Sequence, residues 1–164
     1  MNVTTATNAP AHRTDDDILL TARDVRKYYG EQEQRILVLD RINLELRADE
    51  FVALLGPSGS GKSTLLRLLA GLALPSSGAV LVHGEPLRGV NPQVAVVFQS
   101  FALYPWLTVL ENVEMGLLVK AMAPAERREK ALAAIDLIGL DGFESAYPRE
   151  LSGGMKQRVG FARA

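Results

Sequence analysis

The chain has 164 residues, enough for one domain with a sizeable core. With 18 Lys and Arg against 19 Asp and Glu, its formal net charge of −1 gives no electrostatic reason to expect nucleic-acid binding. It has no cysteine, so disulfides and thiolate metal sites are excluded. It also has no apolar run long enough to cross a membrane and no secretory signal. We expect any membrane association to come through a partner.

The amino-terminal half predicts two kinds of strand. Residues 1–16 are rich in Thr, Ala and Asn and are predicted to be a flexible tail. Strands are predicted at Ile18–Val25 and Arg35–Leu39, and Ile42–Arg47 alternates apolar with polar residues, as in an antiparallel sheet with one exposed face. The five apolar residues Phe51–Leu55 instead predict a strand that is buried on both faces.

A glycine-rich turn follows Phe51–Leu55 and fits the pattern G-x-x-x-x-G-K-[ST], and Leu65–Ala70 then continues as a helix. Backbone N–H groups at such a turn attract phosphate oxygens, Lys62 can place a positive charge near the β- and γ-phosphates, and the Ser63 hydroxyl can bind Mg²⁺. We therefore predict binding of a nucleoside triphosphate with Mg²⁺. The predicted site comprises Gly56, Pro57, Ser58, Gly59, Ser60, Gly61, Lys62, Ser63 and Thr64.

Two further strands are predicted at Val80–Val82 and Val94–Phe98, and the second ends in Gln99. A glutamine at the carboxyl end of a parallel strand faces the ligand crevice of an α/β sheet. From the residues alone, Gln99 is equally compatible with an ordinary surface position.

From Ser100 onward the pattern is helical. Thr108 is a suitable cap for a helix over Val109–Val119, and a second helix is predicted from Pro124 to a stop at Gly139. The charged run Glu126–Lys130 is predicted to be a solvated face of that helix. Its predicted core positions are Ala131, Leu132, Ile135 and Ile138.

A third helix is predicted to begin at Ser152, a good N-cap, and the two glycines that follow leave the first helical N–H groups uncovered. This helix end is a second candidate for anion binding, and a capping loop without special function is the alternative. Two such ends suggest that one nucleotide is gripped from both sides. The segment comprises Leu151, Ser152, Gly153, Gly154, Met155, Lys156, Gln157 and Arg158.

This segment resembles the LSGGQ signature of ATP-binding-cassette (ABC) ATPases, with Met155 where glutamine is commonest. The resemblance covers residues 18–164. It implies that Gln99 is the Q-loop glutamine, which contacts Mg²⁺ and the attacking water, and that Tyr29 stacks on adenine, with the adjacent Tyr28 as the alternative. It also implies signature contacts with the ATP of a partner subunit, made by Leu151, Ser152, Gly153, Gly154, Met155 and Gln157.

The fold implied is α/β: a P-loop NTPase core with a peripheral antiparallel β-subdomain and an inserted α-helical subdomain. Residues 17–164 would form a partial ABC ATPase domain, with β-subdomain and core over 17–99, helical subdomain over 100–150, and signature and helix over 151–164. Family members continue into a Walker B aspartate, a catalytic glutamate and a switch histidine. We therefore expect the amino-terminal portion of such an ATPase, incomplete at its carboxyl end and unable to turn over ATP alone.

The stretch Phe101–Val113 resembles importer ATPases, and Pro105-Trp106 is most similar to the nitrate/sulfonate/taurine group. The resemblance implies a subunit that hydrolyses ATP to power solute import, works as a head-to-tail homodimer, and lies in the cytoplasm on the inner face of the membrane. Its partners would be permease subunits and, indirectly, a solute-binding protein, with no nucleic acid. The alternatives are an inactive nucleotide-binding fragment and a cytosolic ABC ATPase without transport, which the short interval from Gln99 to Ser152 and the single P-loop disfavour.

Overall fold

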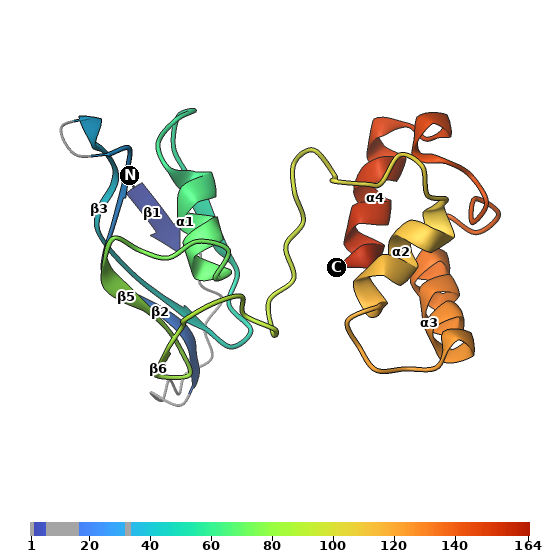
Figure 1. The fold of residues 1–164 in the computed structure, drawn as a ribbon, viewed down its shortest axis with the longest axis horizontal. Helices are drawn as coiled ribbons and strands as arrows, with labels where there is room; N and C mark the ends of the chain where they lie inside the picture. Colours follow the sequence, from blue (N-terminus) through green and yellow to red (C-terminus); the bar gives the residue numbers. More distant parts are fainter. Residues whose placement is uncertain (1, 6–16, 32–33) are drawn as a thin grey trace. The chain divides into compact units, whose positions relative to one another are not determined.

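The computed structural model describes residues 2–5, 17–31 and 34–164, and these divide into two compact units, Met1–Val94 and Ala95–Ala164 (Figure 1). Residues 6–16 of the predicted tail lie outside the described part of the chain. None of the helices in the described ranges is both long and apolar enough to cross a membrane.

The first unit contains a four-stranded antiparallel sheet in the order β3-β2-β5-β6. The bounds of its strands are β2 (Ile18–Tyr29), β3 (Ile36–Arg47), β5 (Ser77–Val82) and β6 (Glu85–Pro86). The predicted antiparallel arrangement is confirmed, but β2 and β3 continue through the expected breaks after Val25 and Leu39. Register shifts on either side of Val25 absorb the irregularity, and Asp24, at φ 47°, donates its backbone N–H to the Asn43 side chain at 2.9 Å.

A separate two-stranded sheet pairs β4 (Val52–Leu55) antiparallel with β1 (Asn2–Thr5). The prediction that this apolar strand is buried on both faces is wrong, because Leu55 is 59% exposed and the preceding Phe51 is 77% exposed. A strand with one hydrogen-bonded neighbour keeps its other edge and much of its faces in solvent.

The helix α1 (Lys62–Leu69) lies against the strands of the first unit (Figure 1). Its buried residues Leu65 and Leu68 are three apart and therefore share one face, which joins the same core cluster as Val25 and Leu39. Burying a leucine side chain stabilises a fold by roughly 1.5–3 kcal/mol. This packing fixes α1, and with it the glycine-rich turn that precedes it.

The expected strand over Val94–Phe98 is not formed, and the segment runs as a loop with Val94, Val97 and Phe98 partly exposed. A buried parallel strand needs a hydrogen-bonded neighbour on each side, and none of the strands in the described residues pairs with this segment. Gln99 therefore lies on a loop and not at the end of a strand.

The second unit is helical and contains α2 (Val109–Leu117), α3 (Pro124–Leu137) and α4 (Gly153–Arg163), with a short 3-10 turn at Pro148–Glu150. The predicted start of α3 at Pro124 is confirmed, and α2 ends two residues before the predicted Val119. The core prediction is correct for Ala131 and Ile135 and wrong for Leu132, which is partly exposed. The hydrophobic core cluster of this unit contains Val109, Leu110, Val113, Ala131, Ile135, Leu140, Leu151 and Val159.

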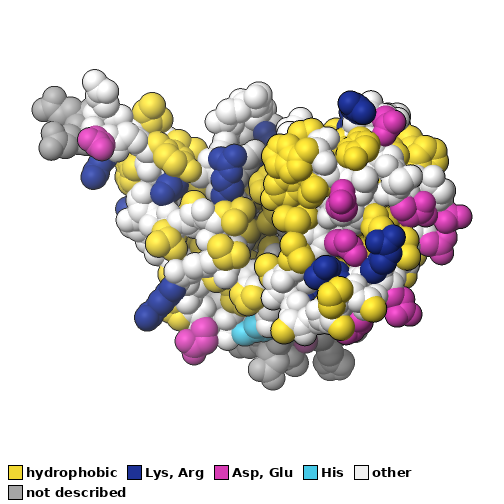
Figure 2. Space-filling model, turned by 45° about the vertical axis from the view of Figure 1, so that its right-hand side comes forward, with side chains coloured by type: hydrophobic (Ala, Val, Ile, Leu, Met, Phe, Trp, Pro, Cys, Tyr) yellow, Lys and Arg dark blue, Asp and Glu magenta, His cyan; other side chains and the backbone are white. Residues whose placement is uncertain are grey.

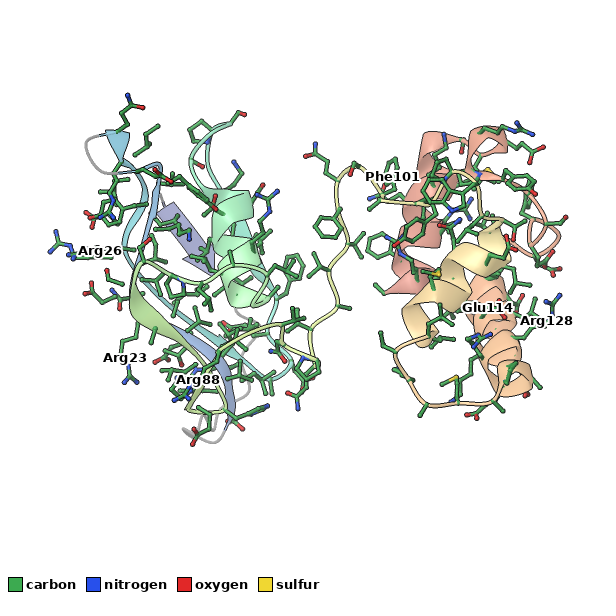
Figure 3. All side chains as sticks on the ribbon, viewed as in Figure 1. Arg23, Arg26, Arg88, Phe101, Glu114 and Arg128 are labelled. Carbon is green, nitrogen blue, oxygen red and sulfur yellow. The ribbon has the colours of Figure 1, made fainter. Side chains whose placement is uncertain are left out.

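The helices α2 and α4 approach closely at Gly116, where an added Cβ would lie 2.0 Å from the Arg163 carbonyl oxygen. The Arg163 guanidinium donates to the carbonyl oxygens of Phe101, at 3.0 Å, and Ala102, at 2.5 Å. Both acceptors have positive φ, 61° at Phe101 (labelled in Figure 3) and 48° at Ala102, so Arg163 stabilises a strained turn just after Gln99.

On the face that Figure 2 shows, Lys, Arg, Asp and Glu side chains lie at the surface among hydrophobic ones. Lys130 pairs with Glu126 at 2.8 Å on the exposed face of α3, as the solvated charged run predicts. In the first unit Arg26 pairs with Asp40 at 3.0 Å (Figure 3). Exposed pairs of this kind contribute about 0–1 kcal/mol, so they matter more for solubility than for stability.

Candidate functional site

The glycine-rich turn lies between β4 and α1, and two of its glycines have left-handed backbone conformations, Gly59 at φ 79° and Gly61 at φ 91°. A Cβ at Gly61 would lie 2.8 Å from the Leu39 side chain and 3.1 Å from the Val38 carbonyl oxygen. Both the conformation and the close approach of β3 therefore require glycine at position 61.

The N-terminus of α1 is open. Its N-cap is Gly61, which has no side chain to accept a hydrogen bond, and the first turn contains no acidic residue. The first N–H groups of a helix have no intrahelical acceptor and carry the positive end of its dipole. With no side-chain cap, these groups are available to an anion, and the exposed Ser63 hydroxyl lies in the same turn.

The Lys62 ammonium group folds back over the turn. It donates to the carbonyl oxygens of Gly56, at 2.8 Å, and Pro57, at 2.7 Å, and lies 3.4 Å from the Ser60 hydroxyl. The three N–H donors of the Lys62 ammonium group thus have three oxygen acceptors within the turn. A phosphate would exchange neutral acceptors for a charged one, which makes a stronger hydrogen bond.

The N-terminus of α4 is capped at one N–H and is otherwise open. Its N-cap Ser152 accepts from the Met155 N–H at 3.3 Å, while a Cβ added at Gly153 or Gly154 would meet no atom within 4 Å. The backbone of these two glycines is therefore accessible to a large anionic ligand. Leu151 is buried and holds the segment to the helical core, and Met155 packs against the same core.

The N-terminus of α2, by contrast, is closed. Thr108 and Glu111 form a reciprocal capping box, with Thr108 N–H to Glu111 carboxylate at 2.7 Å and Glu111 N–H to Thr108 hydroxyl at 3.2 Å. The Val109 and Leu110 N–H groups donate to the carbonyl oxygens of Ala146 and Glu144, at 2.8 and 3.0 Å. The backbone hydrogen bond from Thr108 lowers the pKa of Glu111, and the one from the Gly142 backbone lowers that of Glu144.

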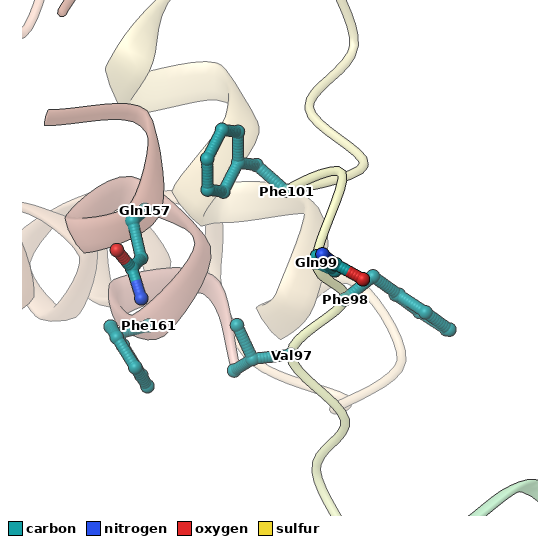
Figure 4. Close-up of a pocket in the computed structure, with 6 residues that line it drawn as sticks. All are labelled: Val97, Phe98, Gln99, Phe101, Gln157 and Phe161. Carbon is teal, nitrogen blue, oxygen red and sulfur yellow. The ribbon is translucent and has the colours of Figure 1, made fainter. Parts of the chain in front are cut away.

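Gln99 lines an open pocket of about 550 Å³ in the second unit, together with Gln157 of α4 (Figure 4). Its other lining residues are Val97, Phe98, Phe101 and Phe161. Val97 lies near Gly160 of α4, where an added Cβ would be in ordinary contact with its side chain at 3.7 Å. The structure thus brings Gln99 and the signature residue Gln157 together, whereas Lys62 and Ser63 belong to the first unit.

Both tyrosines near the end of β2 are partly exposed, so either ring is accessible to a planar ligand. Lys27 places its ammonium group 5.1 Å from the centroid of the Tyr29 ring and also donates to the Leu74 carbonyl oxygen at 2.9 Å. The backbone N–H of Tyr28 donates to the Ser76 hydroxyl at 3.1 Å. The Lys27 ammonium group thus makes a cation–π contact with the Tyr29 ring.

Among the described residues, no group of three or more His, Cys, Asp and Glu side chains could hold a metal ion. His83 lies 3.3 Å from the Gln93 side-chain oxygen at the surface. Mg²⁺ in nucleotide sites is bound mainly by phosphate oxygens, water and one or two side-chain oxygens. The exposed Ser63 hydroxyl fits such a site, because the neighbouring open helix end would hold the phosphates.

The chain is similar to known ATP-binding proteins. Residues 39–164 match the ABC transporter family. The chain is similar to a nitrate import ATP-binding protein of Synechocystis sp., with 45% identity over 145 residues, 88% of this chain and 54% of that protein. It is 48% identical over 145 residues to a spermidine/putrescine import ATP-binding protein of Methylococcus capsulatus, covering 87% of this chain and 37% of that protein.

Among solved structures, the chain is similar to a dimeric ATP-binding cassette in a post-hydrolysis state with bound ADP and Pi. The match has a TM-score of 0.79 and 37% identity, and it covers 88% of this chain and 68% of that one. This similarity confirms the predicted fold class, an α/β ABC ATPase. The chain spans about half the length of the curated relatives it matches, as in the 54% of the nitrate import protein.

Proposed function

Because the chain belongs to the ABC transporter family, we propose that it binds ATP through Gly56–Thr64 and presents Ser152, Gly153 and Gly154 to the ATP of a second copy. The observation that carries this proposal is the contrast between helix ends: α1 has no side-chain cap, α4 is capped by Ser152 at a single N–H while the backbone of Gly153 and Gly154 stays accessible, and α2 is closed by its capping box. The two open ends lie in different units, and the predicted motifs fall on both. The ATP of one copy and the signature of the other would meet in a head-to-tail homodimer.

In this proposal Lys62 neutralises the β- and γ-phosphates, Ser63 and Gln99 contact Mg²⁺, and Gln99 orients the attacking water. Phosphoryl transfer to water then depends on positioning and charge neutralisation. The first turns of α1 and α4 contain no carboxylate that could act as a base there. We therefore propose that the 164-residue polypeptide by itself binds ATP without appreciable turnover.

Stacking of adenine on Tyr29 gives a test of nucleotide binding. We expect Tyr29→Ala to weaken binding of a fluorescent ATP analogue by roughly 1–3 kcal/mol, the range found for base stacking on aromatic rings. Tyr28→Ala is the matched control, because it removes a neighbouring, equally accessible ring and should have little effect. Loss for Tyr28→Ala with none for Tyr29→Ala would assign the contact to the other tyrosine, and no loss for either would contradict stacking at this end of β2.

We further propose that the helical unit docks on a membrane permease, which would place the protein on the cytoplasmic face of the membrane and couple ATP to solute import. The proposal rests on the similarity of Phe101–Val113 to importer ATPases and on the exposure of Trp106. The cargo belongs to the nitrate/sulfonate/taurine group in this proposal. Nitrate and aliphatic sulfonate import proteins are among the relatives, at 45% and 40% identity, alongside a spermidine/putrescine import protein at 48%.

Cysteine cross-linking tests the docking directly, because the sequence contains no cysteine of its own. In membranes that contain the cognate permease, a cysteine at Leu107, which leaves the Trp106 ring in place, should form a cross-link with a permease subunit. A cysteine at the exposed Arg88 of the first unit is the control and should form none. Capture of soluble proteins alone would favour a cytosolic ABC ATPase without a transport role.

A further inference from the structure

Trp106 occupies the tip of a tight turn in the helical unit. The Leu107 N–H donates to the Tyr104 carbonyl oxygen at 3.1 Å, so Tyr104–Leu107 forms a β-turn with Pro105 at its second position, where the fixed φ of proline fits. Trp106 is 70% exposed, and its ring lies 5.6 Å from the Tyr104 ring at an angle of 53°. A large aromatic pair is thus held at the surface of a short turn.

Asn112, on α2, lies directly beneath this turn and is completely buried, with 0% of its surface exposed. Its side-chain oxygen accepts from the Tyr104 N–H at 2.8 Å. Its amide nitrogen lies 3.1 Å from the Tyr104 carbonyl oxygen, 3.0 Å from that of Leu107 and 2.9 Å from that of Thr108. Both ends of the turn are therefore bound to one side chain.

The surroundings of Asn112 fix the orientation of its amide. The opposite orientation would place the side-chain oxygen against three carbonyl oxygens and the NH₂ group against an N–H donor. Two amide hydrogens serve three acceptors, so one hydrogen is shared, and the side chain uses its full donor capacity on the turn. No other residue type presents both an acceptor and a two-hydrogen donor at this distance from the helix.

We propose that Asn112 is a positioning residue that holds the Tyr104–Leu107 turn rigid, so that Tyr104 and Trp106 form a preorganised docking surface for the permease. This inference rests on the proposed docking of the helical unit. Asn112 itself is buried and contacts no partner. A fixed turn loses little conformational freedom on binding, and an exposed tryptophan is the residue type most often found at the energetic centre of an interface.

Trp106 is the single tryptophan of the chain and therefore reports on the turn specifically. Asn112→Ala should increase the fast local motion of Trp106 in time-resolved fluorescence anisotropy. It should also lower cross-linking of the permease through a cysteine at Leu107 at least tenfold, to the level of Trp106→Ala. The double variant with both Asn112→Ala and Trp106→Ala should cross-link the permease no less than either single variant. The matched control is Asn91→Ala, which removes a buried asparagine of the first unit and should leave both readouts unchanged.

A second variant covers the case in which Asn112→Ala unfolds the helical unit, which circular dichroism would reveal. Pro105→Gly changes an exposed residue, loosens the turn and leaves Asn112 in place. It should raise Trp106 mobility and lower capture while the helix signal is kept. Unchanged Trp106 mobility in a folded Asn112→Ala chain, or full capture by a mobile Pro105→Gly turn, would overturn the positioning role. Absence of capture by the parent chain would instead overturn the docking on which it rests.

Discussion

Lys62→Ala should abolish tight ATP binding. The lysine supplies the one side-chain cation of the glycine-rich turn, and removing one partner of a desolvated charge pair costs about 2–5 kcal/mol, or roughly 30-fold to several thousand-fold in affinity. Its ammonium group already lies against the carbonyl oxygens of Gly56 and Pro57, so a small movement brings it to a bound phosphate. Titration with a fluorescent ATP analogue measures the loss.

The matched control for this prediction is Arg67→Ala, which removes an exposed cation from the last turn of the same helix. Its effect on ATP affinity should be small, because it lies at the negative end of the helix dipole, away from the turn. Thermal unfolding without nucleotide should show that both variants remain folded. Binding of ATP by Lys62→Ala within about twofold of the parent would mean that Gly56–Thr64 is not the phosphate site.

The features that could be predicted from the sequence are those that a few neighbouring residues determine. Thr108 caps α2 and Ser152 caps α4 as predicted, and Gly61 adopts the left-handed conformation that the glycine-rich turn requires. Each depends on hydrogen bonds or backbone conformations within four residues. The open and closed helix ends that define the candidate site follow from these local choices.

The predictions that failed concern contacts between distant segments. Phe51–Leu55 and Val94–Phe98 have the composition of buried strands, but burial requires neighbouring strands, which composition does not reveal. Leu132 fits a helical core pattern, yet the partners of α3 lie on the side of Ala131 and Ile135. A short apolar pattern indicates that a face is available, and the rest of the fold decides whether it is covered.

Two residues that hold turns in the helical unit were not predicted from the sequence, because their hydrogen-bond partners lie outside their own helices. Asn112 acts on a turn that precedes its helix, and Arg163 binds carbonyl oxygens 61 and 62 residues earlier in the chain. A polar residue among the apolar positions of α2 is the one signal in the sequence that could have indicated Asn112.

Alanine substitutions at two helical glycines should have opposite outcomes. At Gly116 the new methyl group would lie 2.0 Å from a backbone oxygen of α4, so the two helices must separate, at a cost of about 1–3 kcal/mol or more. At Gly154 the methyl group meets no atom within 4 Å, and alanine favours a helix by up to about 1 kcal/mol over glycine. Gly116→Ala should therefore lower the melting temperature by roughly 2–12 °C, and Gly154→Ala should leave it unchanged or raise it.

The same two variants should have the opposite order in ATP-dependent dimerisation: Gly154→Ala should be impaired and Gly116→Ala should not. In the proposed dimer the exposed backbone at Gly153 and Gly154 approaches the ATP of the second copy, and a methyl group at Gly154 occupies the space that the phosphates need. ATP-dependent dimerisation of the protein, measured by light scattering, should weaken at least tenfold in Gly154→Ala. At a temperature where it remains folded, Gly116→Ala should dimerise like the parent. Normal dimerisation of a folded Gly154→Ala variant would show that the N-terminus of α4 does not contact nucleotide.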